Sequence, residues 1–213
     1  MTKKNREQVL ATLESLYGLE KCGLDFDTPF ELLIATILSA QCTDVRVNIV
    51  TKDLFRCYNT PKTILLLGEK GLLEKIKSCG LSNIKAKNII LTCDRLLSEY
   101  DGIVPKSMDE LISLPGVGRK TANVVMSNAF DIPAIAVDTH VFRVSKRIGL
   151  AKGKTVLEVE KELMKNIPRE QWSHAHHWLI WHGRRCCVAR NPKCAECKLQ
   201  TLCDYGKQYL KEA

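Results

Sequence analysis

Residues 114–122 read Leu114-Pro115-Gly116-Val117-Gly118-Arg119-Lys120-Thr121-Ala122 and lie between two stretches whose apolar residues have helical spacing. The two glycines around Val117 permit a tight turn and a close approach of another backbone. A helix begins directly after the turn, so its unpaired N–H groups and positive dipole end are available to a phosphate. A plain connection between two helices is the alternative, since Pro and Gly are common there. We predict DNA contacts at Gly116, Val117, Gly118 and Arg119.

The composition agrees with a phosphate-rich partner. The 213 residues include 32 Lys and Arg against 24 Asp and Glu, a formal net charge of +8. A basic protein of this kind attracts the backbone of a nucleic acid. With 45% hydrophobic and 26% charged residues, disordered and collagen-like classes are excluded. The length corresponds to one large domain or two small ones.

Helical spacing continues through almost the whole sequence, and we predict an all-α fold of about ten helices. Ser or Thr stands three residues before Glu at three helix starts, namely Thr28, Ser107 and Thr155. Residues 134–137 have the composition of a strand but no partner run, so we expect a buried connector. No apolar run reaches the ~18 residues of a membrane span. Three histidines of one helix are expected on its surface: His174, His176 and His177.

Lys120 and Asp138 are candidates for chemistry on a sugar. Lys120 lies in the first turn after the hairpin, and Asp138 follows an apolar run and precedes a helix. Taken alone, Lys120 is a phosphate contact and Asp138 a helix cap. Together they favour a desolvated amine that attacks an electrophilic C1′ to form a Schiff base, beside a carboxylate that stabilises positive charge on the sugar.

Ten cysteines are unusual for this length. The N-terminus lacks the apolar core of a signal peptide, so we expect an intracellular protein that uses clustered cysteines for metal. Four of them have the spacing C-x6-C-x2-C-x5-C, namely Cys187, Cys194, Cys197 and Cys203. Four thiolates suit zinc or a 4Fe-4S cluster about equally. The other six are expected as small buried side chains: Cys22, Cys42, Cys57, Cys79, Cys93 and Cys186.

The hairpin, the Val137-Asp138-Thr139-His140 segment and the cysteine spacing together resemble the endonuclease III family, over essentially the full length. That family comprises DNA glycosylases with abasic-site lyase activity that act on oxidised pyrimidines. The resemblance implies that Lys120 displaces the damaged base and drives β-elimination, with Asp138 as its carboxylate partner. It also implies a 4Fe-4S cluster, instead of zinc, on Cys187, Cys194, Cys197 and Cys203.

The resemblance implies further contacts with DNA. Gln41, in Ser39-Ala40-Gln41-Cys42-Thr43-Asp44, corresponds to a glutamine that fills the space left by an extruded nucleotide, and Leu81 to a leucine that wedges into the duplex. Cys42 stands where we expect alanine. In the loop between the first two cluster cysteines, Arg190 and Lys193 are candidate phosphate contacts; solvated charges are the alternative.

Two domains are implied as well: residues 22–132 with six helices and the hairpin, and residues 1–21 with 133–213 around the cluster. DNA would bind across the cleft, to a cytoplasmic, nucleoid-associated monomer. One rival is a monofunctional adenine glycosylase, which lacks the lysine and has a catalytic glutamate in the segment matching residues 34–39, where this chain has no acid. The other is a non-catalytic DNA-binding iron–sulfur protein in which Lys120 only contacts phosphate.

Overall fold

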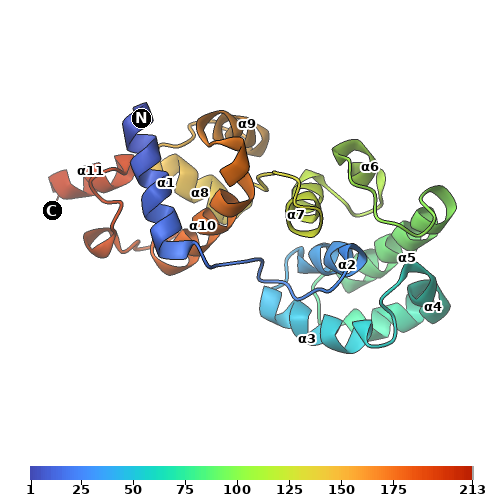
Figure 1. Ribbon diagram of the computed structural model, residues 1–213. Helices are drawn as coiled ribbons and strands as arrows, with labels where there is room; N and C mark the ends of the chain where they lie inside the picture. Colours follow the sequence, from blue (N-terminus) through green and yellow to red (C-terminus); the bar gives the residue numbers. More distant parts are fainter. Residues whose placement is uncertain (213) are drawn as a thin grey trace. The chain divides into compact units, whose positions relative to one another are not determined.

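The computed structural model describes residues 1–212, which fold into two compact units (Figure 1). One unit is continuous and comprises residues 22–132, whereas the other joins residues 1–21 to the chain from residue 133 onward. All regular structure within residues 1–212 is helical, which confirms the predicted fold class. None of the described helices has the length and apolar character needed to cross a membrane.

The continuous unit is built around one buried helix. It contains α2 (Pro29–Ser39), α3 (Asp44–Phe55), α4 (Pro61–Ile76), α5 (Ser82–Glu99), α6 (Met108–Ser113) and α7 (Arg119–Ala129). Every residue from Phe30 to Leu38 is buried, because α2 is apolar on all sides and packs against α3, α5 and α7. The buried Glu31 is satisfied by the backbone N–H of Asp27, which donates to its Oε2 at 2.7 Å.

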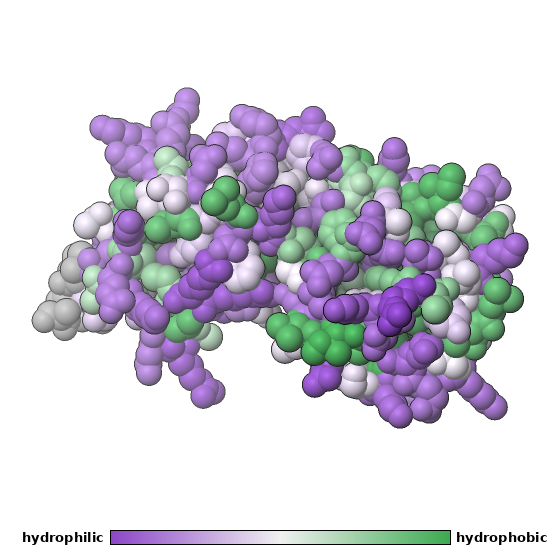
Figure 2. Space-filling model, turned by 60° about the horizontal axis from the view of Figure 1, so that its bottom comes forward, coloured by the Kyte–Doolittle hydropathy of each residue, from purple (hydrophilic) through white to green (hydrophobic). Residues whose placement is uncertain are grey.

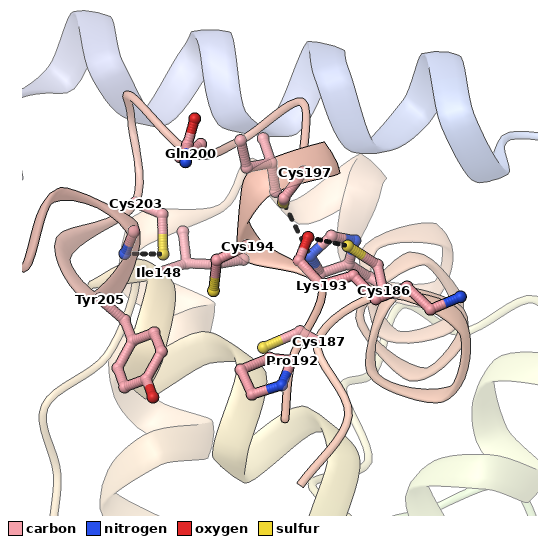
Figure 3. Close-up of a pocket in the computed structure, with 13 residues that line it drawn as sticks. Ile148, Cys186, Cys187, Pro192, Lys193, Cys194, Cys197, Gln200, Cys203 and Tyr205 are labelled. Carbon is pink, nitrogen blue, oxygen red and sulfur yellow. Dashed lines mark hydrogen bonds between the residues drawn. The ribbon is translucent and has the colours of Figure 1, made fainter. Parts of the chain in front are cut away.

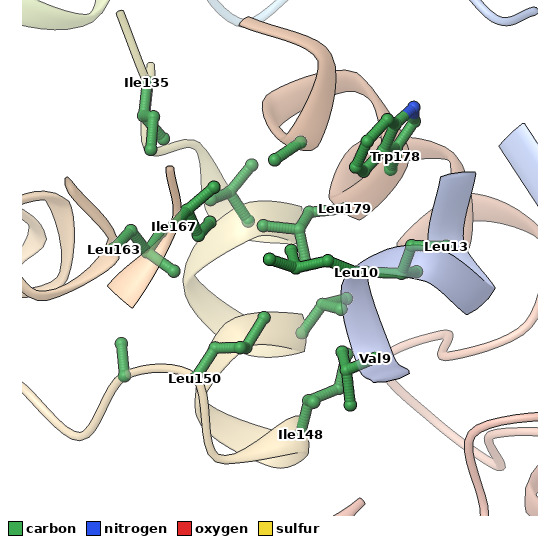
Figure 4. Close-up of a cluster of buried hydrophobic side chains, with 14 of the residues drawn as sticks. Val9, Leu10, Leu13, Ile135, Ile148, Leu150, Leu163, Ile167, Trp178 and Leu179 are labelled. Carbon is green, nitrogen blue, oxygen red and sulfur yellow. The ribbon is translucent and has the colours of Figure 1, made fainter. Parts of the chain in front are cut away.

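The other unit packs its first helix against helices that come late in the chain. It contains α1 (Lys3–Tyr17), α8 (Thr139–Ile148), α9 (Val156–Asn166), η1 (Arg169–Gln171), α10 (Trp172–Arg185), η2 (Cys194–Glu196) and α11 (Asp204–Glu212). Leu13 of α1 and Leu179 of α10 are fully buried in one apolar cluster (Figure 4). Burial of such a side chain stabilises the fold by about 1.5–3 kcal/mol. Residues 134–137 are the expected buried connector.

The three predicted helix starts are confirmed. Thr28, Ser107 and Thr155 each accept a hydrogen bond from the backbone N–H three residues later, at 3.2 to 3.3 Å. Each cap satisfies a donor that the first helical turn leaves unpaired. Thr60 caps α4 in the same way with Thr63 in place of Glu, and the sequence pattern did not reveal it.

Two expectations about burial are wrong in part. His176 is only 3% exposed, because α10 is packed between other helices of its unit instead of lying on the surface. Of the six cysteines expected in the core, only Cys79 and Cys93 are buried, while Cys57 is exposed. The remaining three are half-buried: Cys22, Cys42 and Cys186. Figure 2 shows one face, where hydrophilic side chains predominate and hydrophobic patches lie among them.

Candidate nucleic-acid interface and metal centre

The turn between α6 and α7 is a tight hairpin that lies on α5. The N–H of Val117 donates to the carbonyl of Leu114 at 3.1 Å, and Gly116 has a φ of +77°. A Cβ at Gly116 would stand 3.0 Å from the Cβ of Asn88, so a side chain there would press on α5. Around Gly118 the space is open, with no atom within 4 Å of a Cβ built on it.

Two side chains of α5 hold this hairpin in place. The hydroxyl of Thr92 donates to the carbonyl of Pro115 at 2.7 Å, and a guanidinium nitrogen of Arg95 donates to the carbonyl of Ser113 at 2.6 Å. These bonds satisfy the carbonyls before the turn. The N-cap of α7 is Gly118, which has no side chain to cap the first turn, and the space around it is open.

Lys120 and Asp138 occupy helix starts in different units. Lys120 is exposed in the first turn of α7. Asp138 is half-buried, and its Oδ1 accepts a hydrogen bond from the N–H of Val141 at 2.7 Å, which caps α8. Asp138 is therefore a helix cap, the role predicted for it when it is taken alone. A cap fixes the orientation of the carboxylate, and it leaves a second oxygen on the same group.

Gln41 and Leu81 both have left-handed backbone conformations. Their φ values are +53° and +59°. Within residues 1–212 the other non-glycine residues with positive φ are types that tolerate it, namely Asp101, Asp131 and Asn191. For Gln or Leu this conformation costs roughly 1–2 kcal/mol. Both side chains are solvent-exposed, Leu81 to 49%. The two loops touch, because a Cβ at Gly80 would lie 3.0 Å from the carbonyl oxygen of Gln41.

The four predicted ligand cysteines line one pocket (Figure 3). Cys187, Cys194 and Cys203 are each 9% exposed, and Cys197 is half-buried. Burial raises the pKa of the Cys194 thiol, and the neighbouring thiols of Cys187 and Cys197 raise it further. Burial likewise raises the pKa of Cys203. Thiolates that line one pocket require a compensating positive charge, so the pocket fits a metal centre.

A fifth cysteine also belongs to this pocket. The Sγ of Cys186 donates to the carbonyl of Lys193, and its ligand atom lies within 4.8 Å of those of His182 and Cys197. Burial, followed by the neighbouring Cys197 thiol, raises the pKa of Cys186 to about 12. The expectation that Cys186 is a core residue is therefore wrong. It is one of the cysteines that line the metal pocket.

Two arginines of α8 hold the loop that begins at the first ligand cysteine. Arg143 donates to the carbonyls of Cys187 at 3.1 Å and of Gly183 at 2.9 Å. Arg147 donates to the carbonyls of Val188 at 2.8 Å and of Ala189 at 3.0 Å. Neither arginine could be predicted from the sequence, because their partners are backbone atoms about 40 residues away. The helix capped by Asp138 thus also fixes the cysteine loop.

The basic side chains around that loop differ in whether other side chains of the protein hold them. Arg190 and Lys193 are both exposed. Arg185, which is also exposed, forms an ion pair with Glu20 of the same unit and stacks on Trp181 with 4.4 Å between its guanidinium carbon and the ring centroid. An exposed cation that is not held by an ion pair or a ring contact is the better phosphate contact. Arg190 and Lys193 are therefore better candidates than Arg185.

Residues 34–169 match the family model of HhH-GPD superfamily base excision DNA repair proteins, and residues 187–203 match the iron-sulfur binding domain of endonuclease III. The chain belongs to the endonuclease III family. Endonuclease III of Rickettsia prowazekii is 56% identical over 85% of this chain and 86% of its own length. Endonuclease III of Escherichia coli K12 is 50% identical over 98% and 99%.

Solved structures agree with the family assignment. An endonuclease III trapped as a covalent intermediate with DNA has a TM-score of 0.93 and 50% identity, and the match covers 99% of each chain. Four thiolates alone suit either zinc or an iron–sulfur cluster, and the match to the iron-sulfur binding domain decides between the two. This endonuclease III homologue binds a 4Fe-4S cluster, and not zinc, as predicted.

Proposed function

We propose that this chain removes oxidised pyrimidines from duplex DNA and nicks the resulting abasic site by β-elimination, with Lys120 as the nucleophile and Asp138 as its carboxylate partner. As a member of the endonuclease III family, it is a DNA glycosylase and abasic-site lyase of base-excision repair that acts on duplex DNA. The observation that carries the residue assignment is the exposure of Lys120 in the first turn after the hairpin for which we propose phosphate binding.

Lys120 and Asp138 have different roles in the proposed reaction. The unprotonated amine of Lys120 bonds to C1′ of the sugar, while the N-glycosidic bond breaks and the base leaves with the electron pair and takes up a proton from water. Asp138 stabilises the positive charge that develops on the sugar and accepts a proton from the amine. The bond between C1′ and the ring oxygen then breaks, the ring oxygen takes the proton from Asp138, and the Schiff base forms. Loss of a proton from C2′ to solvent breaks the bond between C3′ and its oxygen, which leaves with the electron pair on the phosphate. Because Lys120 is exposed, the DNA itself must desolvate it.

Gln41 and Leu81 support extrusion of the target nucleotide. C1′ of a stacked nucleotide is out of reach of an amine, so the nucleotide must leave the duplex and other groups must fill the space. An amide can pair with the base opposite, and an apolar side chain can wedge between bases. Their left-handed backbones support this role, because such strain persists where function requires a side chain at a given place.

The remaining contacts follow from charge and loop geometry. We assign phosphate binding to the hairpin residues 116–119 and to Arg190 and Lys193. Cys187, Cys194, Cys197 and Cys203 are the proposed cluster ligands, and the bound cluster supplies a cross-link that keeps this loop folded. The two domains are proposed to correspond to residues 22–132 and to residues 1–21 with 133–213. The enzyme is proposed to act as a monomer on the DNA of the nucleoid.

Borohydride trapping tests the assignment of Lys120. Borohydride reduces a Schiff base to a stable amine, so we expect the wild-type protein to become covalently attached to abasic-site DNA. Lys120→Gln should abolish trapping and leave DNA binding within roughly threefold, since one phosphate contact is worth little of the total affinity. Lys193→Gln is the matched control, because it removes an exposed lysine near DNA and keeps the amine at position 120.

Three results would contradict the proposal. A wild-type protein that does not trap supports the non-catalytic alternative, and trapping by Lys120→Gln places the amine elsewhere. Release of adenine from a mismatched duplex, without release of an oxidised pyrimidine, supports the adenine glycosylase alternative.

A further inference from the structure

Two cysteines accompany the residues proposed to probe DNA, and the proposed function uses neither. Cys42 directly follows Gln41, and Cys79 stands two residues before Leu81. Both belong to the continuous unit. The backbones of the two loops meet where Gly80 approaches the carbonyl of Gln41, and the two thiols are near enough that, besides burial, the Cys42 thiol raises the pKa of Cys79. A pair of thiols therefore lies at the junction of the loops.

The environment of the pair makes one thiol reachable and the other protected. Cys42 is half-buried, whereas Cys79 is completely buried. Burial, followed by the Cys42 thiol, raises the pKa of Cys79 to about 11, while the positive charges of Lys85 and Arg46 lower it. Cys79 is therefore protonated near neutral pH, and the more exposed Cys42 is the thiol that meets solvent first.

A buried cation stands beside both thiols. Lys85 is only 4% exposed, and its Nζ donates to the carbonyl of Leu38 at 2.7 Å. The side chain is thereby fixed in place; burial lowers the pKa of Lys85, and the nearby thiols of Cys79 and Cys42 raise it. A fixed positive charge next to a thiol favours the thiolate, which is the reactive form. A thiol that meets solvent beside a second thiol able to resolve it is the arrangement of an oxidation-sensitive site.

We propose that Cys42 and Cys79 are a modification site, at which a peroxide converts the two thiols into a reversible disulfide that ties the Gln41 loop to the Leu81 loop. The inference goes beyond the proposed function, because the cross-link itself does not depend on DNA. Only its effect on DNA rests on the proposed roles of Gln41 and Leu81. Cytosolic disulfides, where they occur, are usually of this transient and regulatory kind.

The reaction balances with the peroxide as the oxidant. The Cys42 thiolate sulfur attacks one peroxide oxygen, the O–O bond breaks, and the leaving hydroxide takes up the thiol proton to form water. The Cys79 sulfur then attacks the resulting sulfenic acid, the S–S bond forms and the S–O bond breaks. The second hydroxide leaves with the proton of Cys79 as water. The thiols lose two electrons, the peroxide gains them, and a small thiol reverses the step.

The cross-link restricts the side chains that must enter the duplex. Gln41 and Leu81 have to advance into the space of the extruded nucleotide, and each is within two residues of a bonded sulfur in the oxidised protein. A disulfide limits the separation of the two loops to a narrow range. We therefore expect oxidation to reduce capture of DNA and a reductant to restore it.

Peptide mapping of the holoprotein tests the cross-link itself. Wild-type protein is treated with hydrogen peroxide under conditions that leave the visible absorbance of its cluster unchanged, then digested without reduction and analysed by mass spectrometry. We expect one peptide pair joined through Cys42 and Cys79 that dithiothreitol separates. Cys57→Ser, which removes an exposed cysteine, should form the same pair, and Cys42→Ala should not. Free thiols, separately oxidised thiols or other partners in the wild type would overturn the inference.

A trapping assay on the same samples separates the two proposals. Peroxide should cause loss of borohydride trapping in the wild-type protein, dithiothreitol should restore it, and Cys42→Ala should be insensitive to peroxide. If the unoxidised protein traps but the peptide pair never forms, the disulfide is wrong and the proposed function stands. If the peptide pair forms in a protein that never traps, the disulfide stands and the proposed function is wrong. Cross-linked protein that traps as well as reduced protein would overturn the restriction of the two loops.

Discussion

At Asp138 a helix cap and a proposed catalytic carboxylate share one side chain. The cap orients the group, because the hydrogen bond from Val141 N–H fixes Oδ1 at the start of α8. The same helix presents Arg143 and Arg147 to the cysteine loop. A change at position 138 therefore risks two effects at once, on chemistry and on the fold of the unit. A substitution is needed that separates them.

Asp138→Asn separates chemistry from capping. Asn caps a helix about as well as Asp, so the free energy of unfolding should change by less than about 0.5 kcal/mol. The lost charge should slow base release by roughly 10²–10⁴-fold, the range for a positioned acid–base group. Single-turnover base release and urea unfolding measure the two effects.

Asp138→Ala is the matched comparison for that substitution. It should be equally slow and also less stable by about 1 kcal/mol, because alanine cannot cap. Base release by Asp138→Asn at the wild-type rate would remove Asp138 from the mechanism.

Single residues differed in how far the sequence could reveal them. Lys120 and Asp138 are predicted from the sequence because each belongs to a short motif of fixed spacing. Lys85 and Arg143 were missed, because each binds a backbone carbonyl from a distant part of the chain, and a carbonyl leaves no trace in residue type. The burial of His176 was missed for a related reason, since it depends on which helices cover α10.

At the scale of elements, the hairpin between α6 and α7 predicts opposite behaviour for its two glycines. Gly116→Ala should lower the free energy of unfolding by about 1–2 kcal/mol, because Gly116 has positive φ and a methyl group would press on Asn88. Gly118→Ala should leave stability nearly unchanged, because that residue is extended in open space. Its methyl group would instead occupy the place proposed for a phosphate and weaken DNA binding. Urea unfolding and DNA titrations distinguish the two; equal destabilisation would contradict the geometry.

Helix boundaries were predictable where local chemistry determines them. Thr28, Ser107 and Thr155 begin helices because their side chains satisfy the first turn, and this requires only neighbouring residues. The positive φ of Gln41 and Leu81 was not predictable, because neither residue favours that conformation. It is imposed by packing between segments. Local rules thus describe the ordinary elements and fail where the proposed DNA-probing loops lie.

At the scale of the whole molecule, the two units should respond differently to loss of the cluster. Removing iron with ferricyanide and EDTA leaves several buried thiols around an empty pocket, and the loop loses its central cross-link. We expect backbone amides of residues 187–203 to lose protection from hydrogen exchange, while those of residues 22–132 keep theirs, because that unit has its own core around α2. Hydrogen exchange with mass spectrometry gives this comparison. Equal loss of protection in both units would show that the cluster stabilises the entire chain.

The helix α1 precedes the other described helices, yet its packing partner α10 begins only at Trp172. At a synthesis rate of about 5–20 residues per second, the apolar stripe of α1 waits for seconds before α10 leaves the ribosome. An isolated helix of this length is marginal in water, so we expect α1 to become stable only when α10 covers the stripe. The continuous unit, 22–132, is complete during that wait. We therefore expect nascent chains to fold the unit with the hairpin first and to close the unit with the four predicted cluster cysteines last.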